Sequence, residues 1–282
     1  MAKHYEALQR AEAERRRTLA GESAPVLPVD WDTTPLSAPK PKKHFLKRLF
    51  SRKKESREMS ESANQLNKRR ISMLQPDSFV AEQFRMLRGR IDSLATQQTI
   101  KTVAMTSANS DEGKSTAAIN LAVVTSMSLG RRVLLVDCDL RRPTIHRSLG
   151  LEPGPGLAEV LQDRNSLEEA VISVDDLSLD VLPVRTRPTN PSELLASLAM
   201  RRLIEDVCER YDQVIFDTPA CLGLPDAKTI SELCDGIVLV VRADNTPKGD
   251  VEAALEILDR RRVLGLVLNG VDSGKSGDGY YY

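Results

Sequence analysis

Apolar and polar positions follow two different patterns on either side of residue 76. Beyond that point, short apolar runs alternate with stretches in which apolar residues recur every three or four positions. The runs predict buried strands, and the stretches predict helices with one face on a core. The predicted strands are TVAMT, VLLV, SLDVLPV, YDQVIFDTPA, GIVLVVRAD and VLGLVLNGV. Strands that alternate with helices predict an α/β fold, with a mostly parallel sheet, helices on both faces and a ligand crevice at the carboxyl ends of the strands.

The predicted helices differ in length. Residues 77 to 95 form the first, and its apolar residues mark a side that faces the core: Val80, Phe84, Leu87, Ile91 and Leu94. Short helices are expected in GLAEVLQ and SLEEAV. A long helix is expected to open at residues 187 to 193, with Asn190 or Ser192 as its cap. The segments PDAKTISELC and GDVEAALEILDRR complete the set.

Residues 1 to 75 have a different composition. They contain 17 Lys and Arg against nine Asp and Glu, a net charge of +8, which leaves −8 for the rest of a chain with no net charge. Five prolines in residues 21 to 43 predict a linker. Residues 40 to 54 mix eight Lys and Arg with two Phe and two Leu, which is typical of segments that bind anionic membranes, acidic partners or nucleic acid, and equally of a solvated charge run.

These differences predict three parts of the chain: an N-terminal extension (1–75), a folded domain (76–273) and a tail (274–282). No apolar run approaches the roughly 18 residues that span a bilayer, and the N-terminus lacks an apolar signal core. The four cysteines have no metal-binding spacing and are expected to be buried reduced thiols: Cys138, Cys208, Cys221 and Cys234. We therefore expect a cytoplasmic protein.

The segment from residue 102 to 141 predicts a strand-helix-strand unit with a phosphate site. Its first strand leads into SANSDEGKST, where a helix is expected to begin near Ser115. Backbone amides and the helix dipole at such a point attract phosphates. Lys114 is expected to reach the β- and γ-phosphates, and the Ser115 hydroxyl to bind Mg²⁺. The expected nucleotide contacts are Ser110, Asp111, Glu112, Gly113, Lys114, Ser115 and Thr116.

This loop departs from the usual spacing G-x-x-x-x-G-K-[ST]. Ala108 stands at the place of the first glycine, and Asp111 at a place where glycine is common. Because Asp tolerates a positive φ better than most residues, we expect the loop to close with some strain.

Three carboxylates are predicted at the same edge of the sheet as Lys114. Asp137 and Asp139 follow one strand, and Asp217 ends another. A magnesium triphosphate needs anionic oxygens for the metal and, for transfer to a hydroxyl, a base near the nucleophile. We expect Asp217 and one member of the Asp137/Asp139 pair at the metal, with the other member as base. The sequence does not assign these two roles.

The motifs TSANSDEGKST, VLLVDCDLRRP and VIFDTP resemble, in this order, the Walker A, Walker A′ and Walker B motifs of bacterial tyrosine kinases. These are P-loop NTPases related to MinD and ParA, and cytoplasmic autokinases of polysaccharide synthesis and export. The resemblance covers residues 76 to 282 and implies a P-loop fold, ATP and Mg²⁺ as cofactors, and protein-tyrosine kinase activity. Ala220 and Cys221 depart from the proline and aliphatic residue usual after the third motif.

Glu82, Arg85 and Arg88 are spaced as an exposed stripe that can form ion pairs across a subunit boundary or serve as a solvated face. They resemble the family's E-x-x-R-x-x-R motif, which implies a ring of subunits. The final residues resemble its tyrosine cluster, phosphorylated in trans by the neighbouring subunit: Tyr280, Tyr281 and Tyr282. Three glycines precede them, so an extended tail is expected.

The partners follow from the same resemblance. The family's fused transmembrane domain is not found in the sequence, which implies the split type, in which a separate membrane-embedded polysaccharide co-polymerase activates the kinase. Residues 40 to 54, or a charged helix expected at residues 3 to 19, are candidates for docking to that activator or to an anionic membrane. Such docking would recruit the protein to the inner face of the cell membrane. No nucleic-acid partner is expected.

Two other functions remain open. Positioning ATPases of the MinD/ParA type share the sheet and the unusual loop, but they carry an extra lysine where this chain has Asn109. That difference and the tyrosine tail argue against them. The other alternative is a regulatory scaffold that binds ATP without efficient transfer.

Overall fold

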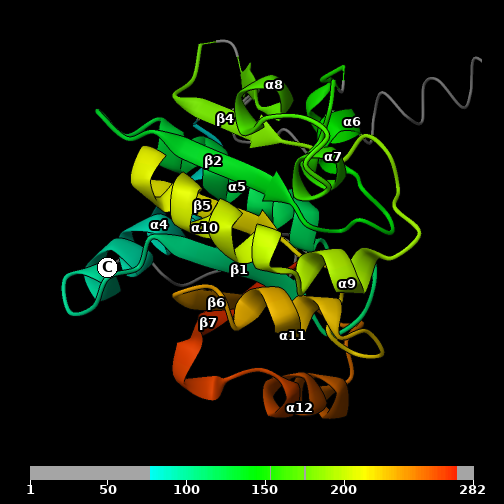
Figure 1. Ribbon diagram of the computed structural model, residues 1–282. Helices are drawn as coiled ribbons and strands as arrows, with labels where there is room; N and C mark the ends of the chain where they lie inside the picture. Colours follow the sequence, from blue (N-terminus) through cyan, green and yellow to red (C-terminus); the bar gives the residue numbers. More distant parts are fainter. Residues whose placement is uncertain (1–76, 153, 175, 272–282) are drawn as a thin grey trace, which may run out of the picture. The chain divides into compact units, whose positions relative to one another are not determined.

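The structure, a computed structural model, describes residues 77–152, 154–174 and 176–271. A sheet with the strand order β3-β4-β2-β5-β1-β6-β7 forms its centre (Figure 1). Neighbouring strands are parallel except β3 and β4. The strands are β1 (Thr102–Ser107), β2 (Val133–Asp137), β3 (Ile172–Val174), β4 (Leu179–Leu182), β5 (Gln213–Asp217), β6 (Gly236–Arg242) and β7 (Val263–Asn269).

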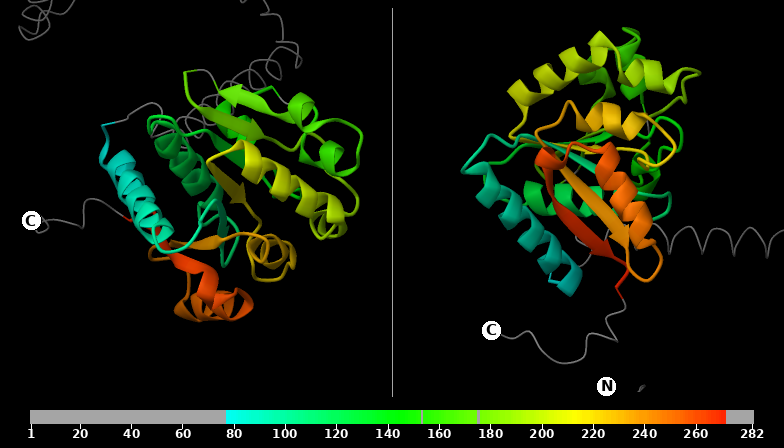
Figure 2. Two further views of the ribbon diagram at one scale, coloured as in Figure 1. Left: turned by 60° about the vertical axis from the view of Figure 1, so that its left-hand side comes forward. Right: turned by 90° about the horizontal axis from the view of Figure 1, so that it is seen from below.

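Helices cover both faces of this sheet (Figures 1 and 2). They are α4 (Phe79–Ala95), α5 (Lys114–Ser126), α6 (Ile145–Leu149), α7 (Leu157–Leu161), α8 (Leu167–Ala170), α9 (Pro191–Leu195), α10 (Leu198–Arg210), α11 (Asp226–Ser231) and α12 (Lys248–Ile257), with a 3-10 turn, η1, at Arg260–Arg262. The helices α4 and α5 share a core with Val103 and Met105 of β1, whereas α7 to α11 share a second core with Ala104. Successive strand residues thus point to opposite cores, as the pleat requires.

The predicted fold class is confirmed, because every strand predicted from an apolar run is present and the sheet is mostly parallel. Helix α4 begins after Ser78, whose hydroxyl oxygen accepts the N–H of Ala81 (3.2 Å). The predicted N-terminal extension and the tyrosine tail lie outside the described residues. In the part of the chain that the structure describes, no helix has the length and apolar character needed to cross a bilayer.

The single long helix predicted after residue 187 is wrong. The structure has two helices there, α9 and α10, and Asn190 is the N-cap residue of the first. The chain leaves helical geometry at Ser197 (ψ 163°), whose hydroxyl oxygen accepts the N–H of Met200 (3.3 Å). A serine cap begins a new helix here because it supplies an acceptor for an N–H group that has no helical partner.

The prediction of β7 as a buried strand is also wrong. It is the edge strand of the sheet, and Leu266 and Leu268 are 54% and 61% exposed. The opposite edge carries β3, which was not predicted from the sequence because it has only three residues. The four cysteines are free thiols; three are buried as predicted, and Cys208 is half-buried.

Candidate functional site

The predicted phosphate loop lies between the end of β1 and the start of α5. Its backbone has a positive φ at Asp111 (63°) and at Gly113 (93°), the N-cap of α5. Ser110 and Asp111 are exposed on this loop. A left-handed backbone is strained for a residue other than glycine, so the strain expected at Asp111 is present. The loop closes on the helix N-terminus although Ala108 replaces the usual first glycine.

The first turn of α5 brings a cation to the loop. The Nζ atom of Lys114 lies 3.5 Å from Oδ2 of Asp139, and the two side chains are only 13% and 9% exposed. The other carboxylate oxygen of Asp139 accepts the N–H of Arg142 (2.8 Å). Ser115 and Thr116 are half-buried in the same turn. Lys114 therefore places a positive charge where the helix dipole already favours anions.

Asp137 and Asp217 lie side by side at the carboxyl ends of β2 and β5. Both are fully buried. One oxygen of Asp137 accepts the N–H groups of Thr144 (3.1 Å) and Ile145 (3.2 Å), and the other accepts that of Asp139 (3.2 Å). Burial, and next the charge of Asp217, raise the pKa of Asp137 well above its usual range.

This pair of carboxylates fits a magnesium site. Mg²⁺ binds one or two protein carboxylates and takes its other ligands from phosphates and water, and its charge would offset the repulsion between two buried acids. In residues 77–152, 154–174 and 176–271, no group of three or more His, Cys, Asp or Glu is arranged to hold a metal ion. The three carboxylates predicted at this edge are thus in two places. Asp137 and Asp217 form a buried pair, whereas Asp139 faces Lys114.

A second network near the site was not predicted. Arg141 donates from Nε to Asp226 (2.8 Å) and from Nη2 to Ser192 (2.9 Å), and the Ser192 hydroxyl donates to Asp226 (2.5 Å). Asp226 is the first residue of α11 and is 1% exposed. These bonds tie the segment after β2 to α9 and α11. The partners lie 51 and 85 residues from Arg141, so no local sequence pattern reveals them.

The stripe predicted on α4 is only partly exposed. Glu82 and Arg85 form an ion pair on the same helix. Arg88 instead donates to the backbone oxygen of Val124 and to the hydroxyl of Ser128, both at 2.7 Å, at the C-terminal end of α5. A helix C-terminus has carbonyl groups without helical partners, which explains why it attracts a guanidinium. The predicted exposed stripe is therefore correct only in part: the Glu82 side chain is 58% exposed, but those of Arg85 and Arg88 are 28% and 26% exposed.

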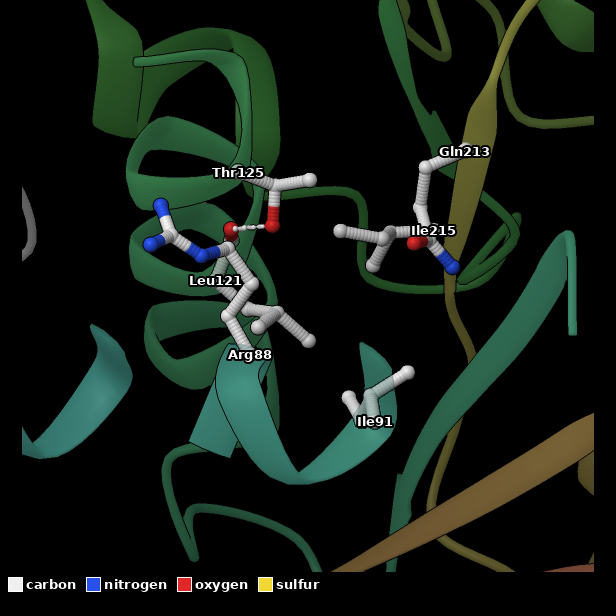
Figure 3. Close-up of a pocket in the computed structure, with 6 residues that line it drawn as sticks. All are labelled: Arg88, Ile91, Leu121, Thr125, Gln213 and Ile215. Carbon is white, nitrogen blue, oxygen red and sulfur yellow. Dashed lines mark hydrogen bonds between the residues drawn. The ribbon is translucent and has the colours of Figure 1, made fainter. Parts of the chain in front are cut away.

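Figure 3 shows Arg88 reaching from α4 towards α5. It lines one side of a hollow together with Ile91, Leu121, Thr125, Gln213 and Ile215. The hollow has no room for a water molecule, so it is a packing feature between α4, α5 and β5.

We predict that Arg88→Ala lowers the free energy of unfolding by about 1 to 3 kcal/mol, because two acceptors on α5 lose a charged donor. Thermal unfolding of the dilute protein measures this change. Arg201→Ala, at an exposed position of α10, is the control and should change stability by less than about 0.5 kcal/mol. An unchanged unfolding midpoint for Arg88→Ala would show that the hydrogen bonds of Arg88 to α5 do not stabilise the folded subunit.

Comparison with known proteins decides the family. Residues 100–256 match the model of a family described as AAA domain. The tyrosine-protein kinase YwqD of Bacillus subtilis (strain 168) is 41% identical over 214 residues, which are 75% of this chain and 90% of YwqD. The chain belongs to the bacterial tyrosine kinases. The family resemblance predicted from the three motifs is thus confirmed.

Solved structures agree with this membership. The structure of the chimerical protein CapA2B2 is similar to this bacterial tyrosine kinase with a TM-score of 0.69 and 34% identity, over 73% of this chain and 91% of that chain. The cell division ATPase MinD of Pyrococcus furiosus is more distant, with a TM-score of 0.53 and 24% identity over 61% of this chain and 74% of that chain. The likeness to MinD shows a shared P-loop ATPase fold and nothing about a shared function.

One longer relative has a name that refers to a pathway. The succinoglycan biosynthesis transport protein ExoP of Rhizobium meliloti (strain 1021) is 35% identical over 213 residues. The match spans 74% of this bacterial tyrosine kinase but only 27% of ExoP. The likeness is thus confined to about a quarter of that protein.

Proposed function

We propose that the chain is an ATP-dependent protein-tyrosine kinase that phosphorylates its own C-terminal tyrosines in trans. The observation that supports this most is the position of Lys114, the first residue of the helix that follows the phosphate loop, 3.5 Å from the carboxylate of Asp139. Phosphoryl transfer requires a positive charge that stabilises the phosphates and, next to it, a base that accepts the proton of the attacking hydroxyl. Lys114 and the carboxylate of Asp139 can supply these two groups.

In this mechanism the binding of ATP changes the partner of Lys114. In the structure Lys114 pairs with Asp139. When phosphates occupy the loop, they compete for the ammonium group, and Asp139 becomes available as the base. The tyrosine oxygen then attacks the γ-phosphorus, its proton passes to Asp139, the bond to the bridging oxygen breaks, and ADP leaves. Asp139 rather than Asp137 is our candidate for the base, because Asp137 is fully buried against Asp217.

Asp137, Asp217 and the hydroxyl of Ser115 are the residues that would hold Mg²⁺. When bound, Mg²⁺ neutralises charge on the β- and γ-phosphates. Lys114 and Ser115 would act through their side chains, and the other loop residues from Ser110 to Thr116 would contact the nucleotide through their backbone groups. Glu112 is buried and can contribute only its backbone.

The proposed assembly follows the family resemblance. Subunits would associate through α4, with Glu82 and Arg85 at the boundary and Arg88 holding α4 on α5. The ring would lie in the cytoplasm, at the inner face of the membrane, next to a membrane-embedded polysaccharide co-polymerase. The ExoP likeness supports a role in exopolysaccharide or capsule synthesis or export. Docking through residues 40 to 54 is part of the same proposal and concerns residues outside the described ones.

A phosphotyrosine assay tests the function. Purified protein incubated with Mg-ATP should become phosphorylated on tyrosine, and a variant with Tyr280, Tyr281 and Tyr282 all changed to Phe should lose at least about nine-tenths of the signal if the tail is the acceptor. The variant should still bind ATP in calorimetry. The control Tyr211→Phe removes a tyrosine whose hydroxyl donates to Asp180 (2.8 Å), and it should keep the signal.

The outcome also separates the alternatives. ATP binding without any tyrosine phosphorylation would support the regulatory scaffold. ATP hydrolysis without phosphorylation would support the positioning ATPase. A full signal from the triple Phe variant would move the acceptor to another tyrosine and contradict the proposed tail.

A further inference from the structure

The phosphate loop has hydrogen bonds on the side away from the acidic pair. Strand β1, from which the loop starts, has β5 and β2 on one side and β6 and β7 on the other. Asp137 and Asp217 lie on the β5 and β2 side. The bonds on the β6 and β7 side are not explained by contact with phosphate or metal.

We call five of the residues that form these bonds the loop latch: Asn109, Glu112, Thr246, Asp250 and Asn269. On the same side, Arg242 donates from Nη1 to the backbone oxygen of Asp111 (3.3 Å). The carboxylate of Glu112 accepts the N–H of Asn109 (3.1 Å) and the hydroxyl of Thr246 (2.5 Å). The side chain of Asn109 donates to Asp250 (2.7 Å), and that of Asn269 donates to the backbone oxygen of Glu112 (2.9 Å). The loop is therefore joined to the turn after β6, to the first turn of α12 and to the end of β7.

Glu112 is a buried acidic residue of the phosphate loop. Its side chain is buried, with 2% exposed, although the loop is predicted to bind anions. A buried negative charge close to that site opposes phosphate binding, so direct contact with the nucleotide does not explain it. The two hydrogen bonds that it accepts explain why a carboxylate is buried here, because a carboxylate is a pure acceptor and can bind both donors at once. The physical role left for Glu112 is to fix the shape of the loop.

The backbone of the phosphate loop needs surrounding contacts that hold its conformation. Asp111 has a positive φ, and a strained backbone persists only when its surroundings hold it in place. Gly113 also touches the latch: a Cβ atom at this position would lie 1.9 Å from the side-chain nitrogen of Asn269. The hydroxyl of Thr246 is itself held, since it accepts the N–H of Arg242 (3.0 Å).

We propose that the loop latch positions the phosphate loop for ATP before the nucleotide arrives, with Glu112 as the positioning residue and Thr246 as its anchor. This inference rests on the proposed function, because it assumes that the loop binds ATP. A loop that is ordered in advance loses less conformational entropy when ATP binds. Without the latch, only a fraction of the molecules is ready for ATP, and the apparent affinity falls by that fraction. Once ATP is bound, the phosphates themselves hold the loop, so catalysis proceeds at the usual rate.

The test replaces the anchor. Thr246→Val removes the hydroxyl and keeps the shape of the side chain; we expect the KM for ATP to rise about tenfold, with kcat within about twofold of the original. Thr246→Ser restores the hydroxyl and should return the KM to within about threefold. Thr229→Val is the matched control, since the hydroxyl of Thr229 donates to Pro225 on the exposed start of α11, and it should leave both constants unchanged.

A second variant tests the other arm of the latch. Asp250→Ala removes the partner of Asn109 and should raise the KM for ATP about threefold, again without a loss in kcat. Normal KM values for both Thr246→Val and Asp250→Ala would overturn the proposal. So would a fall in kcat that Thr246→Ser does not repair. If the unaltered protein binds no Mg-ATP in calorimetry, the proposed function fails; if it binds ATP and Thr246→Val binds equally well, only the latch fails.

Discussion

Lys114→Met is expected to lower the rate of tyrosine phosphorylation at least about 100-fold, the size of effect seen when one preorganised electrostatic group is removed from a transition state. Lys114 is held at the start of α5 with its ammonium group 3.5 Å from Asp139, and methionine keeps its length but not its charge. The variant also leaves Asp139 without the cation that faces it. Incorporation of labelled phosphate from Mg-ATP measures the loss.

Lys228→Met is the matched control for this change. Lys228 lies on α11 with its side chain 51% exposed and pairs only at 3.8 Å with Glu232 of the same helix, so its removal should leave the rate within about twofold. Near-normal phosphorylation by Lys114→Met would contradict the assignment of the cation and, with it, the phosphate loop as the site of transfer.

Asp217→Asn is expected to stabilise the metal-free protein and to inactivate it. Asp217 and Asp137 are buried next to each other, and the charge of Asp217 helps to raise the pKa of Asp137. A raised pKa in the folded state means that stability is lost as the pH rises from the usual Asp range through the folded pKa. Removing the charge of Asp217 should raise the free energy of unfolding by about 1 to 2 kcal/mol near neutral pH, which raises the unfolding midpoint by about 2 to 8 °C.

Activity should change in the opposite direction, with at least about a 100-fold fall, because an amide replaces a carboxylate that would hold Mg²⁺. Incorporation of labelled phosphate from Mg-ATP measures the loss of activity, and thermal unfolding measures the gain in stability. Thermal unfolding with Mg-ATP also tests binding, because the ligand should stabilise the unaltered protein more than the variant. Asp206→Asn, on α10 with its side chain 39% exposed, is the control and should shift the midpoint by no more than about 1 °C. A lower midpoint for Asp217→Asn would contradict the idea that the buried pair is under electrostatic strain.

The residues that the sequence marked most clearly are those whose signal is local. Apolar runs predicted the strands of the central sheet, because a strand buried on both faces has few polar residues. The loop closing on Gly113 and the acidic ends of β2 and β5 also have local signals in the sequence. They were predicted to lie together because parallel strands bring their carboxyl ends to one edge of the sheet. The family resemblance rested on these same segments, and the comparison with YwqD confirmed it.

One error has a local cause: the long helix after residue 187 is interrupted because Ser197 caps a new helix through the N–H of Met200, three residues away. The other errors came from places where a distant partner decides the local structure. The exposure of Leu266 depends on β7 being at the edge of the sheet, and strand order cannot be read from one strand. Arg88 was predicted on a surface stripe, but α4 packs on α5 and turns its guanidinium to Val124.

The sequence by itself determined most of the alternation of strands and helices, although not β3 or the division between α9 and α10. It also marked the segment of the phosphate loop and the acidic residues at the strand ends, because each is specified by neighbours along the chain. Only the tertiary structure decided that Asp139 faces Lys114 while Asp137 faces Asp217, and that Glu112 is bonded to Thr246. The physical reason is separation along the chain. Glu112 and Thr246 are 134 residues apart, and a hydrogen bond over that distance exists only after the sheet has brought the ends of β1 and β6 together.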